Sequence, residues 1–220
     1  MKKIKKTVRC GCCGEDVEIT MDASARNPRT CFDGRPVFFP KDLIPVYQCP
    51  ECFYTRYNIE TKASKEEKRY VFGAEYQSRW VGAKSLKKYY LSGAELESAE
   101  MKIYYHLVLS WIASAEKNKA EAEGYKKAVL KLYEERNESL QLNEAIVCID
   151  TLRQLKEWEL ALNCILEAKK TVAEIQEIMK VNPKLKTYER ILTLEEMMIS
   201  NSNHKSAYIG DSGYIEFLEN

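Results

Sequence analysis

The sequence has no long run of apolar residues, few histidines and no marked excess of either charge. No stretch approaches the roughly 18 apolar residues of a membrane helix. The basic start Met1-Lys-Lys-Ile leads into polar residues rather than into the apolar core of a signal peptide. With 220 residues, of which 45% are hydrophobic and 30% charged, the chain has the composition of a soluble protein of one or two domains. We therefore expect a cytoplasmic protein without a membrane segment.

The balance of charge argues against a strong nucleic-acid binder. Residues 1–60 carry ten Lys and Arg against eight Asp and Glu, and residues 61–220 carry 24 basic and 25 acidic residues. Neither part has the positive excess of a phosphate-binding surface. We expect the basic arm at the N-terminus to be a solvated terminus, and contact with nucleic acid is the alternative. Its members are Lys2, Lys3, Lys5, Lys6 and Arg9.

Recognisable catalytic motifs are absent from the sequence as well. It contains no nucleophile elbow, no phosphate-binding glycine loop and no His-Glu-x-x-His pattern. Of its two histidines, His106 lies in a helical run and His204 in a loop-like Asn-Ser-Asn-His context. We interpret both as structural or surface residues and predict a protein without catalytic activity of its own.

Four cysteines in two C-x-x-C pairs are the most informative feature that is present. Cys10 and Cys13 enclose Gly-Cys, and Cys49 and Cys52 enclose Pro-Glu. Each pair places two thiolates in one tight turn, and a zinc ion with Zn–S distances of about 2.3 Å requires two such turns facing each other. Cys12 is an alternative ligand, but only the chosen first pair has a two-residue gap followed by glycine. The sequence predicts zinc bound by Cys10, Cys13, Cys49 and Cys52.

The predicted zinc is structural, because a site of four thiolates is closed and leaves no open position for water or substrate. Six of the eight cysteines lie in the first 52 residues. This distribution fits a reducing compartment better than a disulfide scaffold. A thiol redox role competes for the same pairs. Redox pairs stand at the start of a helix, however, whereas strand-like sequence flanks both pairs here. We interpret Cys12 and Cys31 as unreactive free thiols, with a reactive role as the alternative.

Strand-like sequence around both pairs predicts a zinc-ribbon-like β domain over residues 1–60. Residues 15–21 alternate in polarity, and residues 44–48 and 53–59 are rich in aromatic and β-branched side chains. Phe53 stands where such motifs often have glycine.

Residues 22–42 contain three prolines and predict a long loop inserted in this domain. The loop is a candidate binding surface for a peptide or an anionic group, and an Asp–Arg pair that merely fixes the loop is the alternative. The candidate residues are Arg26, Arg29, Asp33 and Arg35.

Helical periodicity begins after residue 61 and predicts an all-α domain over residues 61–200, followed by a loose tail over residues 201–220. Ser64 and Glu67 form a capping-box pattern, so a helix is predicted to start there and run towards Trp80. Gly93 is expected to break the chain before a stronger helical segment.

Two helical hairpins then follow, within residues 103–133 and 142–175, with apolar side chains at three- and four-residue steps. A third hairpin is expected to follow from Pro183. The predicted fold class is α+β, with a small β domain followed by stacked antiparallel helices.

The second hairpin resembles tetratricopeptide repeats, because Lys156-Glu-Trp158-Glu-Leu-Ala161 places an aromatic residue before a small one at the turn. A wider resemblance rests on the two cysteine pairs, on the Arg, Asp and Pro residues between them, and on residues 104–168. Through these features the chain resembles a bacterial family of unknown function with a zinc-ribbon-like head and a tetratricopeptide-like helical region. The resemblance implies this architecture and no particular activity. The helical residues that carry it are Leu107, Trp111, Leu152 and Ala161.

These features together predict a zinc-stabilised, cytoplasmic protein-interaction module. Stacked helical hairpins present extended surfaces for a protein partner, and the ribbon would supply a second contact surface. The first alternative is a nucleic-acid-associated regulator that uses the basic arm and the ribbon. The second is a thiol redox sensor.

Overall fold

The computed structural model describes residues 3–22, 29–40, 43–82, 85–136, 138–178, 183–209 and 215–217. Within these residues the chain forms short antiparallel β-hairpins and eight α-helices, so the predicted α+β class is confirmed. The hairpins pair β1 (Lys3–Arg9) with β2 (Asp16–Asp22), β3 (Tyr47–Gln48) with β4 (Thr55–Arg56), and β5 (Ala207–Ile209) with β6 (Ile215–Phe217). The helices are α1 (Lys65–Val71), α2 (Ala74–Trp80), α3 (Leu86–Leu96), α4 (Ala99–Ala115), α5 (Lys119–Glu135), α6 (Leu142–Gln154), α7 (Trp158–Ile178) and α8 (Pro183–Ser200).

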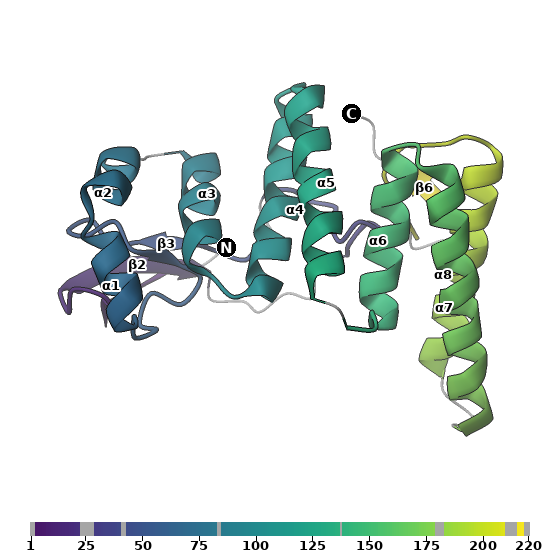
Figure 1. Cartoon of the computed structure of the whole chain (residues 1–220), viewed down its shortest axis with the longest axis horizontal. Helices are drawn as coiled ribbons and strands as arrows, with labels where there is room; N and C mark the ends of the chain where they lie inside the picture. The colour runs from purple at the N-terminus through teal and green to yellow at the C-terminus, as the bar shows by residue number, and fades with distance from the viewer. Residues whose placement is uncertain are drawn as a thin grey trace.

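The elements are arranged side by side along an elongated molecule (Figure 1). The first two hairpins lie at one end with α1 and α2, and we call this part, residues 3–22 and 47–80, the head. Helices α3 to α8 follow towards the other end. One hydrophobic cluster joins the head strands to α1, α2 and the end of α3. The cluster combines side chains from both sides of residue 61, which is the predicted boundary between the two domains. The division into these domains therefore stays a prediction.

The predicted capping box is present, but it starts a short helix. Ser64 Oγ accepts a hydrogen bond from Glu67 N, and Glu67 Oε2 accepts one from Ser64 N, at 3.1 and 2.7 Å. The helix ends after Val71, and a new one starts at Gly73, which is the N-cap of α2. The single helix predicted to run towards Trp80 is therefore two, because the chain turns at Gly73 to bring Trp80 into the head cluster.

From residue 3 onwards the basic arm forms strand β1, and its lysine side chains are exposed to solvent. Residues 3–9 pair with residues 16–22 along their whole length. Lys5 Nζ lies 2.8 Å from Glu18 Oε1 on the paired strand, and Lys6 Nζ lies 3.3 Å from Glu60 Oε2. Two lysines of the arm thus form exposed ion pairs with acids outside the arm. Lys2 falls outside the described residues.

Gly93 does not break the chain, contrary to expectation, but lies inside α3. A Cβ atom at this position would lie 2.4 Å from Cε2 of Tyr105 on α4. The glycine therefore lets α3 and α4 approach closely, and tertiary packing overrides its low helix propensity.

Three helices end in the same way without glycine. Lys117, Lys156 and Ser202 follow α4, α6 and α8 with φ angles of 59, 66 and 51°. In each case a backbone N–H reaches back five residues, as Asn118 N does to Ala113 O at 2.8 Å. This is the Schellman pattern, which satisfies the last carbonyls of a helix and reverses the chain.

Where the structure describes the segment after α8, it contacts the rest of the protein, and the loose tail expected over residues 201–220 stays a prediction. Ala207 is fully buried, and its carbonyl accepts a hydrogen bond of 2.9 Å from Phe32 N in the long loop. That loop packs against the helices rather than the head. Phe32 lies in the cluster of α6, α7 and α8, and the ring of Phe39 stands edge-on to Trp111 of α4 at 6.3 Å.

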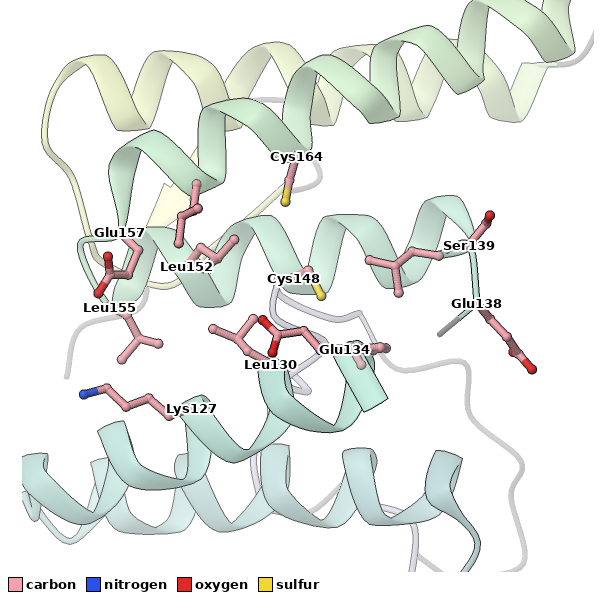
Figure 2. Close-up of a pocket in the computed structure, with 13 residues that line it drawn as sticks. Lys127, Leu130, Glu134, Glu138, Ser139, Cys148, Leu152, Leu155, Glu157 and Cys164 are labelled. Carbon is pink, nitrogen blue, oxygen red and sulfur yellow. The ribbon is translucent and has the colours of Figure 1, made fainter. Parts of the chain in front are cut away.

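An apolar groove of about 740 Å³ lies between α5 and the α6–α7 hairpin (Figure 2). Its floor and walls are mostly leucine, tyrosine and cysteine side chains, and its rim carries one lysine and three glutamates. The apolar lining is Leu130, Tyr133, Leu140, Cys148, Leu152, Leu155, Leu160 and Cys164, and the charged rim is Lys127, Glu134, Glu138 and Glu157. No helix in the described ranges combines the length and apolarity needed to cross a membrane.

Candidate metal centre

The two C-x-x-C pairs form matching turns at the tips of the two head hairpins. In the first, Gly14 N donates to Cys10 O at 2.9 Å, and in the second, Phe53 N donates to Cys49 O at the same distance. The residue after each pair has a positive φ, which is 84° at Gly14 and 60° at Phe53. Phe53 thus takes the conformation that glycine often supplies, and its side chain packs against the head cluster.

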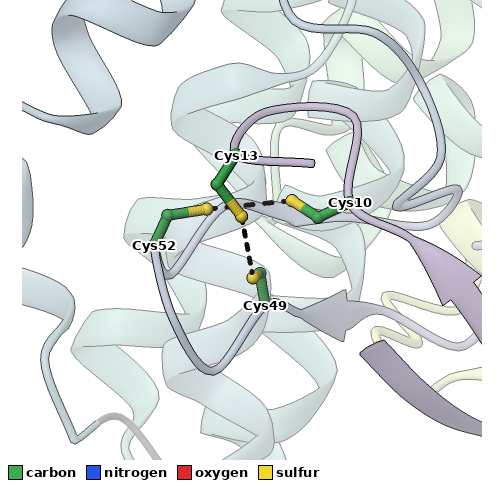
Figure 3. Close-up of side chains that lie close together, drawn as sticks. All are labelled: Cys10, Cys13, Cys49 and Cys52. Atoms are coloured by element: carbon green, nitrogen blue, oxygen red, sulfur yellow. Dashed lines mark hydrogen bonds between the residues drawn. The ribbon is translucent and has the colours of Figure 1, made fainter. Parts of the chain in front are cut away.

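The turns face each other and bring four sulfur atoms together (Figure 3). The Sγ atoms of Cys10, Cys13, Cys49 and Cys52 all lie within 4.8 Å of one another. Cys10 Sγ and Cys52 Sγ are 3.8 Å apart, and Cys13 Sγ and Cys49 Sγ are 3.6 Å apart. A tetrahedral site with Zn–S bonds of about 2.3 Å has sulfur atoms about 3.8 Å apart, so the cluster has the dimensions of a four-thiolate zinc site.

The electrostatics of the cluster favour a cation at its centre. Hydrogen bonds from Cys49 and Cys52 lower the pKa of Cys10. Hydrogen bonding to Cys10 raises the pKa of Cys49 to about 11 and also raises that of Cys52. Several thiolates this close together would repel one another. A divalent cation removes this repulsion and binds all four as thiolates.

Cys12 lies outside this group of four, in agreement with the choice made from the spacing. It is buried, and its backbone N–H points to Cys10 Sγ at 3.4 Å. Burial raises the pKa of Cys12, and the nearby Cys10 raises it further. Cys31 is also buried, and burial raises its pKa to about 12. Both odd thiols are therefore neutral and poorly nucleophilic near pH 7.

Three hydrogen bonds with residues outside the turns hold the cluster in place. Gly11 N donates to Ile59 O at 2.9 Å, and Ala63 N donates to Gly11 O at 3.1 Å. This approach is so close that a Cβ on Gly11 would lie 2.0 Å from Thr61 O. On the other side, Gln77 Nε2 of α2 donates to Cys52 O at 3.0 Å.

Behind the second turn, a buried arginine joins the head to the helices. Arg56 of β4 donates to Glu97 Oε2 at 2.8 Å and to Leu96 O at 2.6 Å, and it also pairs with Glu67 of α1. The free-energy cost of burying this guanidinium is offset by its interactions with two carboxylates and a carbonyl. The position of the metal turns is thus coupled to α1 and to the end of α3.

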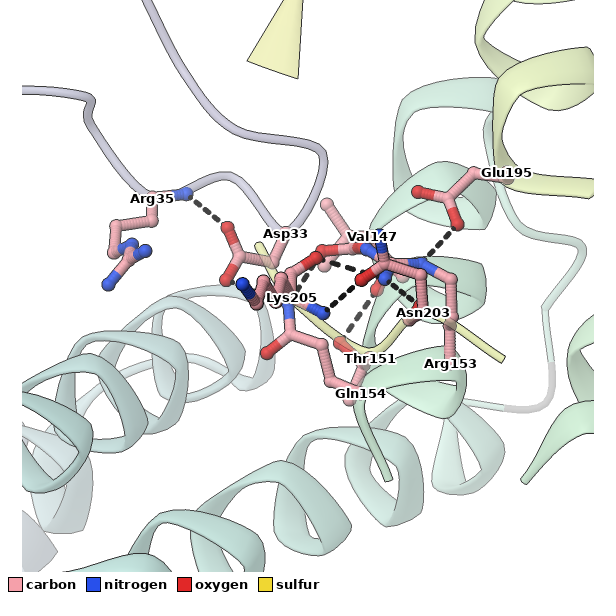
Figure 4. Close-up of polar contacts among 10 residues, drawn as sticks. Asp33, Arg35, Val147, Thr151, Arg153, Gln154, Glu195, Asn203 and Lys205 are labelled. Atoms are coloured by element: carbon pink, nitrogen blue, oxygen red, sulfur yellow. Dashed lines mark hydrogen bonds and ion pairs between the residues drawn. The ribbon is translucent and has the colours of Figure 1, made fainter. Parts of the chain in front are cut away.

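The loop residues predicted to form a binding surface lie away from the cysteines. Arg26 falls outside the described residues, and Arg29 is exposed. Asp33 is only 2% exposed, and it accepts hydrogen bonds from Arg35 N at 3.0 Å and from Gln154 Nε2 at 3.2 Å. Asp33 thus fixes the loop through the backbone of Arg35 rather than through its guanidinium (Figure 4).

A buried ionic cluster beside Asp33 is a feature that the sequence analysis missed (Figure 4). Arg153 has no exposed surface, pairs with Asp150, and donates to Glu195 Oε2 at 2.7 Å and to Asn203 O at 2.6 Å. It ties α6 to α8 and to the turn that follows α8. The available signal was a charged pair three residues apart on a helix whose neighbouring positions are apolar.

Comparison with known proteins does not assign this chain to a family. No protein-family model, curated protein or solved structure matched this chain. The resemblance to a family with a zinc-ribbon-like head and a tetratricopeptide-like region therefore stays a prediction.

Proposed function

We propose that the protein is a zinc-stabilised protein-interaction module, in which Cys10, Cys13, Cys49 and Cys52 hold one structural zinc ion. The observation that carries the metal proposal is the convergence of four sulfur atoms within 4.8 Å at separations suited to tetrahedral zinc. The metal would supply folding energy to the head rather than chemistry, because four thiolates complete its coordination.

Metal analysis of the purified protein tests the zinc proposal. After anaerobic purification from zinc-replete cells, we expect about one zinc per chain. Cys10→Ser and Cys52→Ser should each lose the metal, whereas Cys12→Ser should keep it, because Cys12 lies outside the group of four. Zinc content well below half an equivalent in the wild type would contradict the proposal, and so would equal loss in the Cys12 variant.

The groove between α5 and the α6–α7 hairpin is the proposed partner site. Its lining is apolar, and three glutamates against one lysine make its rim acidic. Leu160, on the groove wall, is 53% exposed, so apolar surface is available to a partner. An amphipathic helical segment with apolar residues on one side and basic residues beside them has the complementary chemistry.

Paired variants on α7 test the groove. Leu160→Arg would place a charge on the groove wall, whereas Leu166→Arg would place the same charge on a residue that is 60% exposed and lies outside the groove lining. In retention assays with the full-length protein and a basic amphipathic helical peptide, we expect the first change to lower affinity at least tenfold. The second should leave affinity within a few-fold of wild type. Equal effects of the two variants would reject the groove.

The nucleic-acid alternative predicts a different dependence on charge. If the basic arm bound phosphate, replacing Lys5 and Lys6 by alanine would weaken binding, and affinity would fall steeply as salt rises. The ion pairs of these lysines with Glu18 and Glu60 reduce the charge available for that role. We therefore expect the double variant to leave partner binding within a few-fold of wild type.

A further inference from the structure

A second, smaller cavity of about 240 Å³ lies beside the N-terminal half of α5, whereas the groove lies along its C-terminal half. It is enclosed by the long loop, α4, α5, the end of α6 and the turn after α8. This cavity, which we call the loop pocket, includes Asp33 and Arg35 of the predicted binding loop. It is separate from the cysteine cluster and takes no part in the proposed zinc site.

The walls of the loop pocket carry more positive than negative charge. Four cationic side chains line it against two carboxylates, those of Asp33 and Glu123. Glu123 Oε1 lies 3.9 Å from Lys119 Nζ, and Asp33 accepts hydrogen bonds from Arg35 N in the loop and from Gln154 Nε2. The cations are Arg35, Lys117, Lys119 and Lys126.

Lys126 and Arg35 are two of these cations that form no ion pair with a carboxylate of the described residues, although the charges of Asp33 and Asp150 act to raise the pKa of Lys126. No carboxylate of the described residues lies within 4 Å of Lys126 Nζ, and burial lowers the pKa of this lysine. Two guanidinium nitrogens of Arg35, Nε and Nη2, are shielded from solvent and have no acceptor among the described residues. The Cys31 thiol beside Arg35 cannot serve as a counter-ion, because burial keeps it neutral.

A third donor in the wall is also without an acceptor. Trp111 is 2% exposed and lines the loop pocket, and its Nε1 hydrogen has no acceptor among the described residues. Buried donors without partners are uncommon in native proteins, and each costs free energy until an acceptor reaches it. Helix α5 starts at this pocket, and the partial positive charge of its first turn adds to the same potential.

We propose that the loop pocket binds a small oxyanion, a molecule that carries a phosphate or carboxylate group. The planar fork of Arg35 matches either group, and Lys126 of α5 supplies a second charge. The volume lies below the roughly 300 Å³ at which pockets for drug-sized ligands begin. The ligand is therefore a small metabolite rather than a nucleotide or a polymer.

Calorimetric titration of the full chain tests this site, with inorganic phosphate and succinate as separate probes and with sodium chloride at matched ionic strength as the reference. We expect saturable binding of at least one probe, and the stronger of the two identifies the ligand group. Lys126→Gln should weaken binding of that probe at least tenfold. Lys127→Gln is the matched control, because Lys127 is the next residue on α5 but lines the groove. Absence of saturable binding, or equal affinity of the two variants, would overturn the proposal.

The two histidines provide a second readout by NMR. His204 lines the loop pocket, and burial, followed by Lys156, Arg153, Lys119 and Lys126, lowers its pKa. A bound anion should raise the pKa of His204, because it offsets these charges. His106, on α4 beside Tyr125, does not line the pocket and should show no shift with the probe. Binding by calorimetry without any change at His204 would place the anion elsewhere and overturn the assignment.

Discussion

Gly11 illustrates how a single residue determines whether the metal turn can form. Its backbone lies against residues 59–63, and a Cβ would fall 2.0 Å from the carbonyl oxygen of Thr61. Gly14, in the same turn, has a positive φ but nothing within 4 Å of its Cβ position. One glycine is therefore needed for space and the other for backbone conformation.

We predict that Gly11→Ala lowers the free energy of unfolding by about 3 kcal/mol, because rigid backbone has to move. Gly14→Ala should cost about 1 kcal/mol, the price of a side chain in the left-handed region. Urea denaturation of the zinc-loaded proteins measures both, and zinc affinity should fall further in the first variant. If the two variants were equally stable, the close approach of the first turn to residues 59–63 would be unimportant.

Glu195 gives a prediction about pH. Burial, then the nearby charge of Asp150, raises the pKa of Glu195 well above its usual range. A carboxyl group with a raised pKa stabilises the fold below its ordinary pKa of about 4.3, and that contribution is lost as pH rises towards the folded-state value. Glu195→Gln, which stays neutral, should therefore gain stability relative to wild type as pH rises above about 4.3.

Urea denaturation at several pH values measures this difference. The control is Glu196→Gln, which removes a carboxylate on the same helix that is partly exposed and pairs with Lys169 at 2.6 Å. That variant should show little change relative to wild type over the same range. If the stability difference between Glu195→Gln and wild type did not vary with pH, Glu195 would be ionised in the folded protein throughout.

At the scale of elements, two helical glycines have opposite roles. Gly93 of α3 stands against Tyr105, so that a Cβ would lie 2.4 Å from the ring, whereas Gly124 of α5 has no atom within 4 Å. The first allows two helices to pack closely, and the second contributes only backbone flexibility.

We predict that Gly93→Ala destabilises the protein by about 2 kcal/mol, because Tyr105 is buried and has to shift. Gly124→Ala should stabilise it by about 0.5 to 1 kcal/mol through helix propensity. Thermal unfolding of both variants compares them directly. A stabilising effect of Gly93→Ala would show that α3 and α4 adjust their spacing easily.

Helix boundaries show what local sequence could predict. The two hairpins that contain α4 to α7 were expected from the apolar periodicity, and the turn between α4 and α5 carries Asn118, the N-cap of α5, whose side chain accepts from Glu121 N at 3.3 Å. The glycine normally expected at a helix end is replaced by Lys117 and Lys156. The backbone hydrogen bonds of the Schellman pattern stabilise these turns even where the residue itself is unfavourable.

At the scale of the whole molecule, the head and the far helices have separate cores. Cys10, Cys49 and Cys52 belong to the same cluster as α1 and α2, whereas α6, α7 and α8 form another. A head of this size buries too little surface to be stable without the proposed zinc ion. Loss of zinc should therefore unfold one end of the molecule first.

We predict that Cys49→Ser loses zinc and unfolds the head while most of the helix content remains. Hydrogen exchange should show loss of protection at Val71 and Tyr76 and retained protection at Ile149 and Ile165. Circular dichroism should change little, because α1 and α2 contribute seven residues each. Loss of most helical signal would show that the two ends fold as one unit.

The sequence by itself determined the α+β class, the capping box at Ser64, the helical hairpins and the four cysteines that converge. Each of these depends on local spacing: a two-residue gap between thiols, a side chain reaching three residues along, or apolar residues on one face of a helix. Such patterns involve neighbours in the chain and can be recognised without knowing the fold.

Only the tertiary structure decided where the long loop packs, how the basic arm is neutralised, and which polar side chains are buried together. Asp33 meets Gln154 across 121 residues of chain, and Arg153 meets Glu195 across 42. The loop pocket likewise combines Arg35, Trp111, Lys126 and His204 from distant segments. No regular spacing in the sequence connects these residues, because only the packing of the elements brings them together. Their charges and their donors without acceptors can therefore be recognised only in the folded structure.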